Sequence, residues 1–213
     1  RNVICLPHSP SGFSTQFKSN FFQNKFSLDI DSTIILHSGW IHGVMQSKSL
    51  ARASRGWPKE WKLVFHERMT RNSSEPYIKE VANAGGQNLY LSLNPVPYNE
   101  IDKVIASSTI GIVIYGSSSE WGTSWISLAK GSGKMAHYLK CGKPVVCVNI
   151  PGFKEIINDY QCGILFNDIN EIHSAILKIL QNYTYYSSNA LKCYKNEYEF
   201  SNYFNKFLEY TRN

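Results

Sequence analysis

The residues of this chain that are best suited to chemistry lie in the stretch Gly131-Ser132-Gly133-Lys134, which runs directly into a segment of helical pattern. Ser132 is a good helix N-cap, and the two glycines let the backbone come close to a ligand. Lys134 would fall in the first helical turn, where a positive side chain opposes the helix dipole unless it meets an anion. The stretch therefore predicts a site for a phosphate or carboxylate group.

Several familiar motifs of nucleotide and metal chemistry do not occur in the sequence. The phosphate-binding loop of ATPases, G-x-x-x-x-G-K-[ST], would need Gly at position 128 and Ser or Thr at position 135, which are Leu128 and Met135. There is no G-x-S-x-G, no G-x-G-x-x-G after the first expected strand and no H-E-x-x-H. We therefore expect no ATPase, hydrolase or dinucleotide chemistry and no metal site, and a structural role for each of the six histidines taken alone.

Six short apolar runs rich in β-branched residues recur along the chain, with turns and stretches of helical pattern between them. They span residues 33–36, 62–65, 88–91, 110–115, 144–148 and 163–166. Several lack an alternation of apolar and polar residues, which is typical of strands covered on both faces. Because strands that alternate with helices pair in parallel, the pattern predicts an α/β fold, a Rossmann-like doubly wound parallel sheet of about six strands.

The chain is expected to divide into three parts. Residues 1–31 hold a strand at 2–6 and then a linker that contains Pro7 and Pro10, residues 32–182 form the sheet domain, and residues 183–213 form a C-terminal helical extension.

Within these parts the helical pattern is clearest over 100–106, over 134–140 and after Asp168 or Asn170, either of which can cap a helix. The helix that follows this cap is expected to bury the face made by Ile172, Ala175, Ile176 and Ile179. In the extension we expect one partly exposed helix over 194–210, with an aromatic face made by Tyr198, Phe204, Phe207 and Leu208.

Ligands of an open parallel sheet bind at the carboxyl ends of the strands, so the residues that follow each run are candidates. Gly39 and Ile41 follow the first run, where the glycine lets the backbone approach a diphosphate or serves only the turn. After the second run, Glu67 could accept from sugar hydroxyls and Arg68 could bind phosphate, or both could form a solvated charge cluster. The stiff loop 95–97 after the third run can offer backbone groups to a base edge or merely end the strand.

Composition bounds the class of partner. The 213 residues are 43% hydrophobic and carry a net charge of +6 that is spread along the chain. A spread basic excess favours a phosphate-bearing ligand or an acidic membrane surface, and no nucleic-acid-binding motif accompanies it, so we expect no nucleic-acid partner. Five cysteines without paired spacing indicate a reducing, cytoplasmic setting. The chain begins at Arg1 and has no apolar run long enough to span a bilayer, so we expect part of a longer soluble protein that at most touches a membrane surface.

One block of the sequence resembles a known family. The pattern Ser132-x-Lys134-x-x-x-Tyr138-Leu139-x-x-Gly142-Lys143-Pro144-Val145-Val146 is similar to the block S-x-K-x-x-E-Y-x-x-x-G-x-P-V-V of retaining GT-B glycosyltransferases. Residues 151–157 and 160–165 are similar to the helix and strand that follow that block. The chain thus resembles the C-terminal, donor-binding domain of the broad glycosyltransferase family 4 and related bacterial polysaccharide glycosyltransferases.

The resemblance implies one half of a two-domain GT-B architecture, whose missing N-terminal domain binds the acceptor. It implies hexosyl transfer from a nucleoside diphosphate sugar to a glycan or lipid-linked acceptor, without a metal or other cofactor, in the cytoplasm or at the inner face of the membrane. Lys134 would supply the catalytic charge, and Gly39 and Gly133 would supply backbone N–H groups. The substrate-binding residues expected besides Lys134 are Gly39, Ile41, Glu67, Arg68, Pro95, Val96, Pro97, Ser132, Gly133 and His137.

The sequence departs from the family at one pair of positions. The paired glutamates of the family, eight residues apart, would fall at Ala129 and His137. His137 or another group would therefore have to replace the second glutamate. Two alternatives stay open at this point: a GT-B enzyme that acts as a sugar-nucleotide epimerase, and a nucleotide-sugar-binding module without catalysis.

Overall fold

The central sheet has the strand order β3-β2-β1-β4-β5-β6, and every neighbouring pair of strands is parallel. The computed structural model describes residues 6–10, 12, 18–116 and 125–212. Each predicted run overlaps one strand, which confirms the expected fold class, whereas the strand predicted at 2–6 falls almost wholly outside the described residues. The strands are β1 (Thr33–Ser38), β2 (Trp61–His66), β3 (Leu89–Ser92), β4 (Ile110–Val113), β5 (Val145–Val148) and β6 (Gly163–Phe166).

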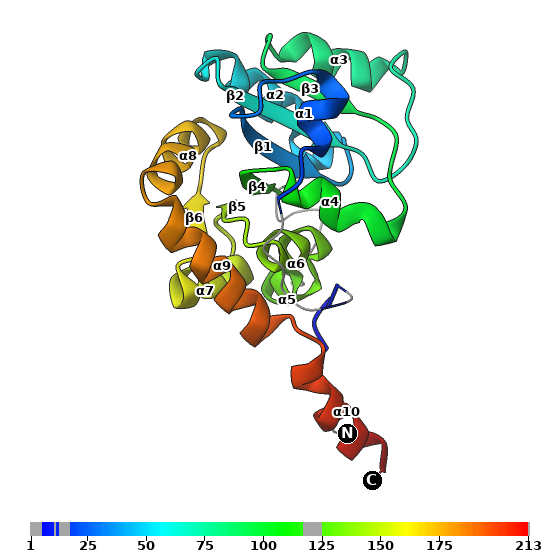
Figure 1. Cartoon of the computed structure of the whole chain (residues 1–213), viewed down its shortest axis with the longest axis vertical. Coiled ribbons are helices and arrows are strands. Elements are labelled where there is room, and N and C mark those ends of the chain that lie inside the picture. The colour runs from blue at the N-terminus through cyan, green and yellow to red at the C-terminus, as the bar shows by residue number, and fades with distance from the viewer. Residues whose placement is uncertain (1–5, 11, 13–17, 117–124, 213) are drawn as a thin grey trace.

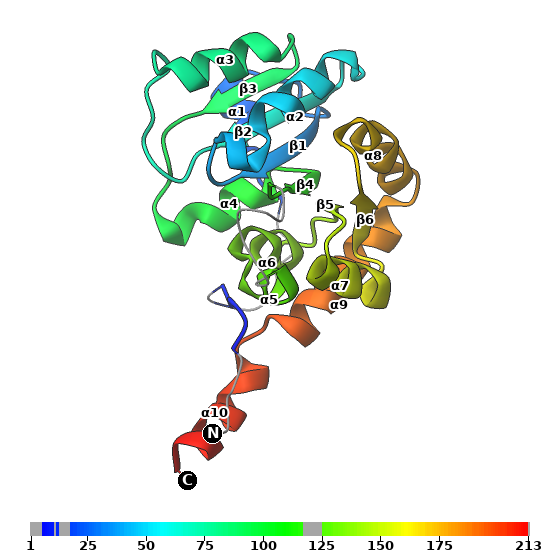
Figure 2. The same cartoon turned by 180° about the vertical axis from the view of Figure 1, so that it is seen from behind.

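Helices cover both faces of the sheet, as Figures 1 and 2 show from opposite sides. Two separate apolar cores result, one between the sheet and each helical layer. One layer consists of α2 (Ser47–Ala53), α3 (Pro76–Ala84) and α8 (Ile172–Gln181). The other consists of α1 (Phe21–Phe26), α4 (Ile101–Ala106), α5 (Trp125–Gly131), α6 (Gly133–Lys140), α7 (Pro151–Tyr160) and α9 (Tyr183–Glu197).

The crossovers change face at the middle of the sheet. The connections from β1 to β2 and from β2 to β3 pass through α2 and α3 on one face, whereas those from β3 onward to β6 pass through α4, α5, α6 and α7 on the other. The connections that leave the neighbouring strands β1 and β4 therefore run toward opposite edges of the sheet. In an open α/β sheet such a switch point leaves a crevice at the carboxyl ends of the two strands.

The predicted helices differ from the structure mainly at their ends. The helix expected over 100–106 is a 3-10 turn, η3 (Tyr98–Glu100), followed by α4, and Asp168 caps another such turn, η6 (Ile169–Glu171), directly before α8. The predicted apolar face of α8 is confirmed, because all four of its residues are buried. Two further 3-10 turns are η1 (Gly43–Met45) and η2 (Ser54–Gly56).

Two helices, α9 and α10 (Ser201–Arg212), replace the single helix predicted over 194–210. The helical conformation is interrupted between them, and this interruption places Tyr198 in the core. There its side chain is fully buried, and its hydroxyl donates to the Ala129 carbonyl at 3.0 Å. The prediction that Tyr198 lies on an exposed aromatic face is therefore wrong. Phe204 and Phe207 remain exposed on α10, which projects from the body of the molecule (Figure 1).

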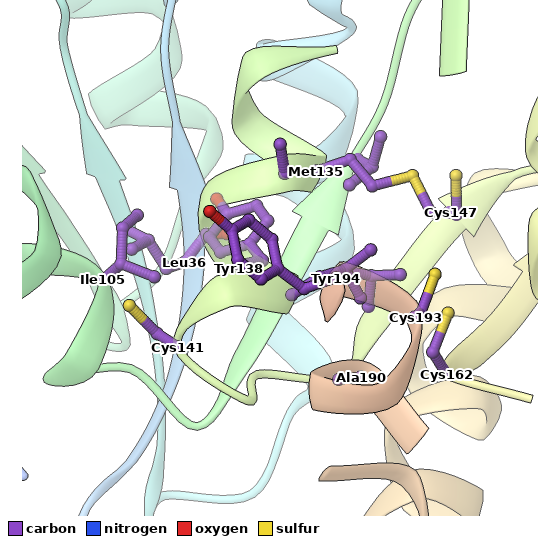
Figure 3. Packing of buried hydrophobic residues seen from close by; sticks show 14 of the residues in the cluster. Leu36, Ile105, Met135, Tyr138, Cys141, Cys147, Cys162, Ala190, Cys193 and Tyr194 are labelled. Carbon is purple, nitrogen blue, oxygen red and sulfur yellow. The ribbon is translucent and has the colours of Figure 1, made fainter. Parts of the chain in front are cut away.

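Tyr138 ties α6 to the end of β1. Its buried hydroxyl donates to the Leu36 carbonyl at 2.7 Å and accepts from the Ser38 N–H at 2.8 Å. Figure 3 shows the ring packed beside Leu36 in the core. Glycine is required at Gly111 of β4, because a Cβ there would lie 2.4 Å from the Tyr138 ring.

We expect Tyr138→Phe to destabilise the protein by about 1–3 kcal/mol, because it leaves a buried N–H and a buried C=O without their partner. Urea denaturation measures this difference. Tyr185→Phe is the matched control, since Tyr185 is 54% exposed and should lose almost nothing. Equal midpoints for the two variants would show that the hydroxyl does not hold α6 in place.

Candidate functional site

A cleft of about 560 Å³ opens at the carboxyl ends of β1 and β4, beside the start of α6. It therefore lies at the switch point of the sheet. Five of the predicted site residues line it: Gly39, Arg68, Gly133, Lys134 and His137. The other residues that line it are His8, Ser38, Trp40, Met45, Tyr98, Ile101, Ile105, Tyr115 and Gly131.

A second hollow of similar size, about 530 Å³, opens at the opposite, amino-terminal edge of β1 and β2. Its charged lining mixes acids with lysines: Asp29, Asp31, Lys59, Glu60 and Lys62. No helix begins among the described residues that line it, and its three acids outnumber its two lysines, which disfavours an anionic ligand. The switch-point cleft is the better candidate for a ligand site.

Gly39 shapes the floor of the cleft at the end of β1. Its φ of +126° is a conformation that L side chains rarely adopt, and a Cβ there would lie 3.7 Å from Cε of Lys134. Its N–H donates to the His66 carbonyl at 2.8 Å, so this group is already engaged in the protein. A Cβ at that distance would only touch the Lys134 side chain, so glycine is needed at position 39 for its backbone conformation. Its predicted part as an N–H donor to a ligand would require breaking the bond to His66.

Glu67 and Ile41 lie behind the wall of the cleft. The Glu67 carboxylate is fully buried and accepts from the N–H groups of Ile41 and Arg68, both at 2.8 Å. Its Oε2 also lies 3.6 Å from the guanidinium of Arg71. These bonds join the loop after β1 to the loop after β2, so in this structure Glu67 orders the site. Its predicted contact with sugar hydroxyls stays untested.

Arg68 stands at the exposed rim of the cleft. Its guanidinium carbon lies 5.5 Å from the centre of the Trp40 ring, and Trp40 in turn stacks on His42 with ring centres 3.9 Å apart. The stack orients a charged group whose long side chain would otherwise be free. A rigid guanidinium at a cleft rim suits bidentate contact with phosphate oxygens.

Lys134 reaches into the cleft from the first turn of α6. Ser132 is the N-cap, as predicted, since its hydroxyl accepts from the N–H of Met135 at 3.3 Å. The Lys134 ammonium lies 4.7 Å from the centre of the Tyr115 ring and 3.9 Å from the sulfur of Met45. No acidic side chain among the described residues forms an ion pair with it. Burial, assisted by the positive charge of Arg68, lowers the pKa of Lys134 to about 8.

His137 lies on the wall of the cleft with a carboxylate behind it. Its Nδ1 is 3.5 Å from Oδ1 of Asp102, and the other oxygen of Asp102 accepts from Lys140. Burial raises the pKa of Asp102, but the nearby His137 ring and the hydrogen bond from Lys140 outweigh this effect and lower the pKa below its ordinary value. The rings of Tyr98 and His8 flank His137, with centres 5.7 and 6.3 Å away.

The loop that contains Pro95, Val96 and Pro97 runs from β3 to η3 and does not itself line the cleft. Val96 packs on the core, and the two prolines are exposed. Tyr98, the next residue, does line the cleft, and its place directly after the loop was a usable signal. His8 gave no local signal, because only the tertiary fold brings it to α6.

His37 contradicts the expectation that each histidine has a satisfied structural role. It is fully buried, neither ring nitrogen has a hydrogen-bond partner among the residues that the structure describes, and burial lowers its pKa well below the ordinary value. Within the described part of the chain, no three His, Cys, Asp or Glu side chains gather closely enough to hold a metal ion. No helix in that part is long and apolar enough to cross a bilayer.

Comparison with known proteins agrees with this geometry. Residues 69–182 match the family model described as glycosyl transferases group 1. No curated protein matches the chain. Similar solved structures include HepE from Anabaena in complex with UDP-glucose, with a TM-score of 0.69, 13% identity and coverage of 91% of this chain and 52% of that one. A glycosyltransferase from Rickettsia africae has a TM-score of 0.68, 17% identity and coverage of 89% and 49%.

This chain therefore spans about half the length of these two structures. A third similar structure is the C-terminal domain of LpcC, a glycosyl transferase group 1 family protein from Francisella tularensis. There the TM-score is 0.62 at 12% identity, and the match covers 88% of this chain and 95% of that one. The fold is thus that of one half of the GT-B architecture.

Because the Lys134 ammonium has no acidic partner among the described residues, we predict that Lys134→Met raises the melting temperature near pH 7 by a few degrees, or about 1 kcal/mol or more. The folded-state pKa of about 8 lies below the ordinary 10.5, so the cost of the charge is present in full below pH 8. This cost to the free energy of folding decreases as the pH rises from about 8 to 10.5, because the folded protein loses the Lys134 proton before the unfolded chain does. Above about pH 10.5 both states have lost the proton and the cost is zero.

Thermal denaturation of both proteins near pH 7 and near pH 9.5 checks this expectation. A gain in stability that is the same at both pH values, or a loss at either, would contradict it.

Proposed function

The chain belongs to the glycosyl transferases group 1 family, and from this premise we propose that its switch-point cleft binds a nucleoside diphosphate sugar as the donor of a glycosyl transfer. One observation carries the proposal: the half-buried Lys134 directs its ammonium into the cleft without an acidic partner among the described residues. A lysine in this position would be stabilised by an anion bound next to it. HepE, which has the same fold over this chain, was solved with UDP and with UDP-glucose, and this supports the proposal.

In the proposed complex the diphosphate lies at the start of α6. The free N–H groups of the first helical turn and the ammonium of Lys134 meet the phosphates, and Arg68 approaches them from the rim. Tyr98, at the end of the loop 95–97, stands on the side of the cleft that would receive the base. These contacts hold the leaving group, and the sugar would then point toward the open mouth of the cleft.

The transfer itself breaks the bond between the anomeric carbon and the diphosphate oxygen. An acceptor hydroxyl oxygen forms the new bond to that carbon, the electron pair of the broken bond stays on the diphosphate oxygen, and that oxygen takes up the proton that the hydroxyl loses. Lys134 and Arg68 stabilise the charge that develops there, which lowers the barrier for departure. We propose no metal for this step, since the two cations and the helix terminus can supply the positive charge.

The finer parts of the proposal concern the acceptor and the location. We propose a hexosyl donor and a glycan or lipid-linked acceptor of bacterial polysaccharide synthesis, held by an N-terminal domain of the same protein. The net charge of +6 supports work in the cytoplasm at an acidic membrane surface.

A second candidate is a nucleotide-sugar-binding module without catalysis. Ala129, which stands where the family block has its first glutamate, is buried in the core, and no carboxylate is among the described residues that line the cleft. Turnover of a nucleoside diphosphate sugar by the protein joined to an acceptor domain would decide for the enzyme.

Lys134→Ala should weaken binding of a nucleoside diphosphate about ten- to a hundredfold, because it removes a charge-assisted contact of about 1.5–3 kcal/mol. The bare nucleoside should bind both proteins alike, since it has no phosphate to lose. Calorimetric titrations with UDP, ADP and GDP and with the matching nucleosides measure both effects. Lys154→Ala, which removes an exposed lysine of α7, is the control. Unchanged diphosphate affinity in Lys134→Ala would remove the observation on which the proposed function rests.

The 213-residue chain by itself is expected to show little or no sugar transfer, because it spans only half of its full-length structural relatives. An assay that couples nucleotide release to product identification, with UDP-glucose as donor, tests this. Robust transfer by the chain alone would contradict the need for a second domain.

A further inference from the structure

Three described residues before α1 are bonded to α5 and α9. The N–H of His8 donates to the Lys130 carbonyl at the end of α5, at 2.7 Å. The hydroxyl of Tyr194 on α9 contacts the carbonyls of Pro10 and Gly12 at 3.1 and 3.0 Å. His8 is therefore presented to the cleft by an anchored backbone.

The imidazole of His8 lies against the first residue of α6. A Cβ at Gly133 would lie 3.0 Å from Nε2 of His8, so the ring packs directly on Gly133 and would have to shift slightly for any larger residue there. His8 and Lys134 both line the cleft. An anion held by the first turn of α6 would thus meet Nε2 of His8 on one side and the Lys134 ammonium on another.

We propose that His8 is a further binding residue for the donor, whose imidazole donates a hydrogen bond from Nε2 to a diphosphate oxygen and takes up a proton when the ligand binds. This inference rests on the proposed function, because it names another contact in the same cleft. The proton comes from solvent, and no covalent bond changes.

The charges around His8 support a change of protonation on binding. The titratable groups that line the cleft with it are Arg68, Tyr98, Tyr115, Lys134 and His137, and Asp102 lies behind His137. Burial, and then the charge of His137, lower the pKa of His8 below its ordinary 6.5, so the free protein holds it neutral at pH 7. Lys130 is turned away into an ion pair with Glu197 at 3.5 Å. Two phosphate groups beside the ring would reverse the balance and raise the pKa of His8.

Lys134 and His8 can be told apart by pH. The pKa of Lys134 is about 8, so proton uptake by Lys134 falls near and above that value. Uptake near pH 6.5 belongs to an imidazole, because the diphosphate of a nucleotide sugar has no group that titrates there.

The test is calorimetric titration near pH 6.5 in buffers of different ionisation enthalpy, which counts the protons taken up per ligand. The probe is whichever of UDP-glucose, ADP-glucose and GDP-mannose binds the protein most tightly. We expect uptake of about half a proton or more in the wild type, and almost none in His8→Gln. The same substitution should weaken binding about fivefold near pH 6 and little near pH 8.

Two further histidine variants make the assignment specific. His173→Gln, which changes a ring that packs on Trp61 outside the cleft, should keep the wild-type proton uptake. Equal uptake in the wild type and His8→Gln, or loss of uptake in His137→Gln with full uptake in His8→Gln, would overturn the inference. A wild type that binds none of the three probes contradicts the proposed function instead.

A second measurement uses only the wild-type protein, so it does not depend on whether a variant folds. The NMR titration of the His8 ring in the wild type gives its pKa with and without the nucleotide sugar. An upward shift of about one unit or more supports the inference, and an unchanged pKa overturns it.

Discussion

The two hydrogen bonds of the Tyr138 hydroxyl fix helix α6 against the end of strand β1, and the position of the cleft follows from them. Gly111 on the neighbouring strand leaves room for the ring, so three elements meet at one side chain. Lys134 lies one helical turn before Tyr138. Because the middle of α6 is anchored to β1, its first turn opens at the switch point, and Lys134 extends over Gly39 into the cleft.

The charges gathered at this point favour a ligand over the empty protein. Lys134, Arg68 and the start of α6 all present positive potential to one cleft, and the described residues that line it include no carboxylate. Burial, and to a lesser extent the charge of Arg68, destabilise the Lys134 ammonium in the free protein, and the lowered pKa of Lys134 reflects that cost. Binding sites are commonly less stable than their fold would allow, because groups arranged for a ligand lack partners until it arrives.

The sequence predicted those features that depend on near neighbours. The six strands follow from local apolar runs, and the cap at Ser132 depends on a contact only three residues away. The sequence could not predict the part that Glu67 plays, because its partner Ile41 lies 26 residues earlier. For the same reason it missed the place of His8 beside Gly133, and it placed Tyr198 on an exposed face although its hydroxyl bonds to a distant carbonyl in the core.

His137 shows how the fold only partly offsets a departure from the family block. That block has a glutamate where this chain has a histidine, yet Asp102 on α4 brings a carboxylate to within 3.5 Å of Nδ1 of His137. Asp102 lies behind His137 and does not itself line the cleft, so the cleft wall loses one carboxylate at this position. In a cleft that already collects cations, that loss further favours an anionic ligand.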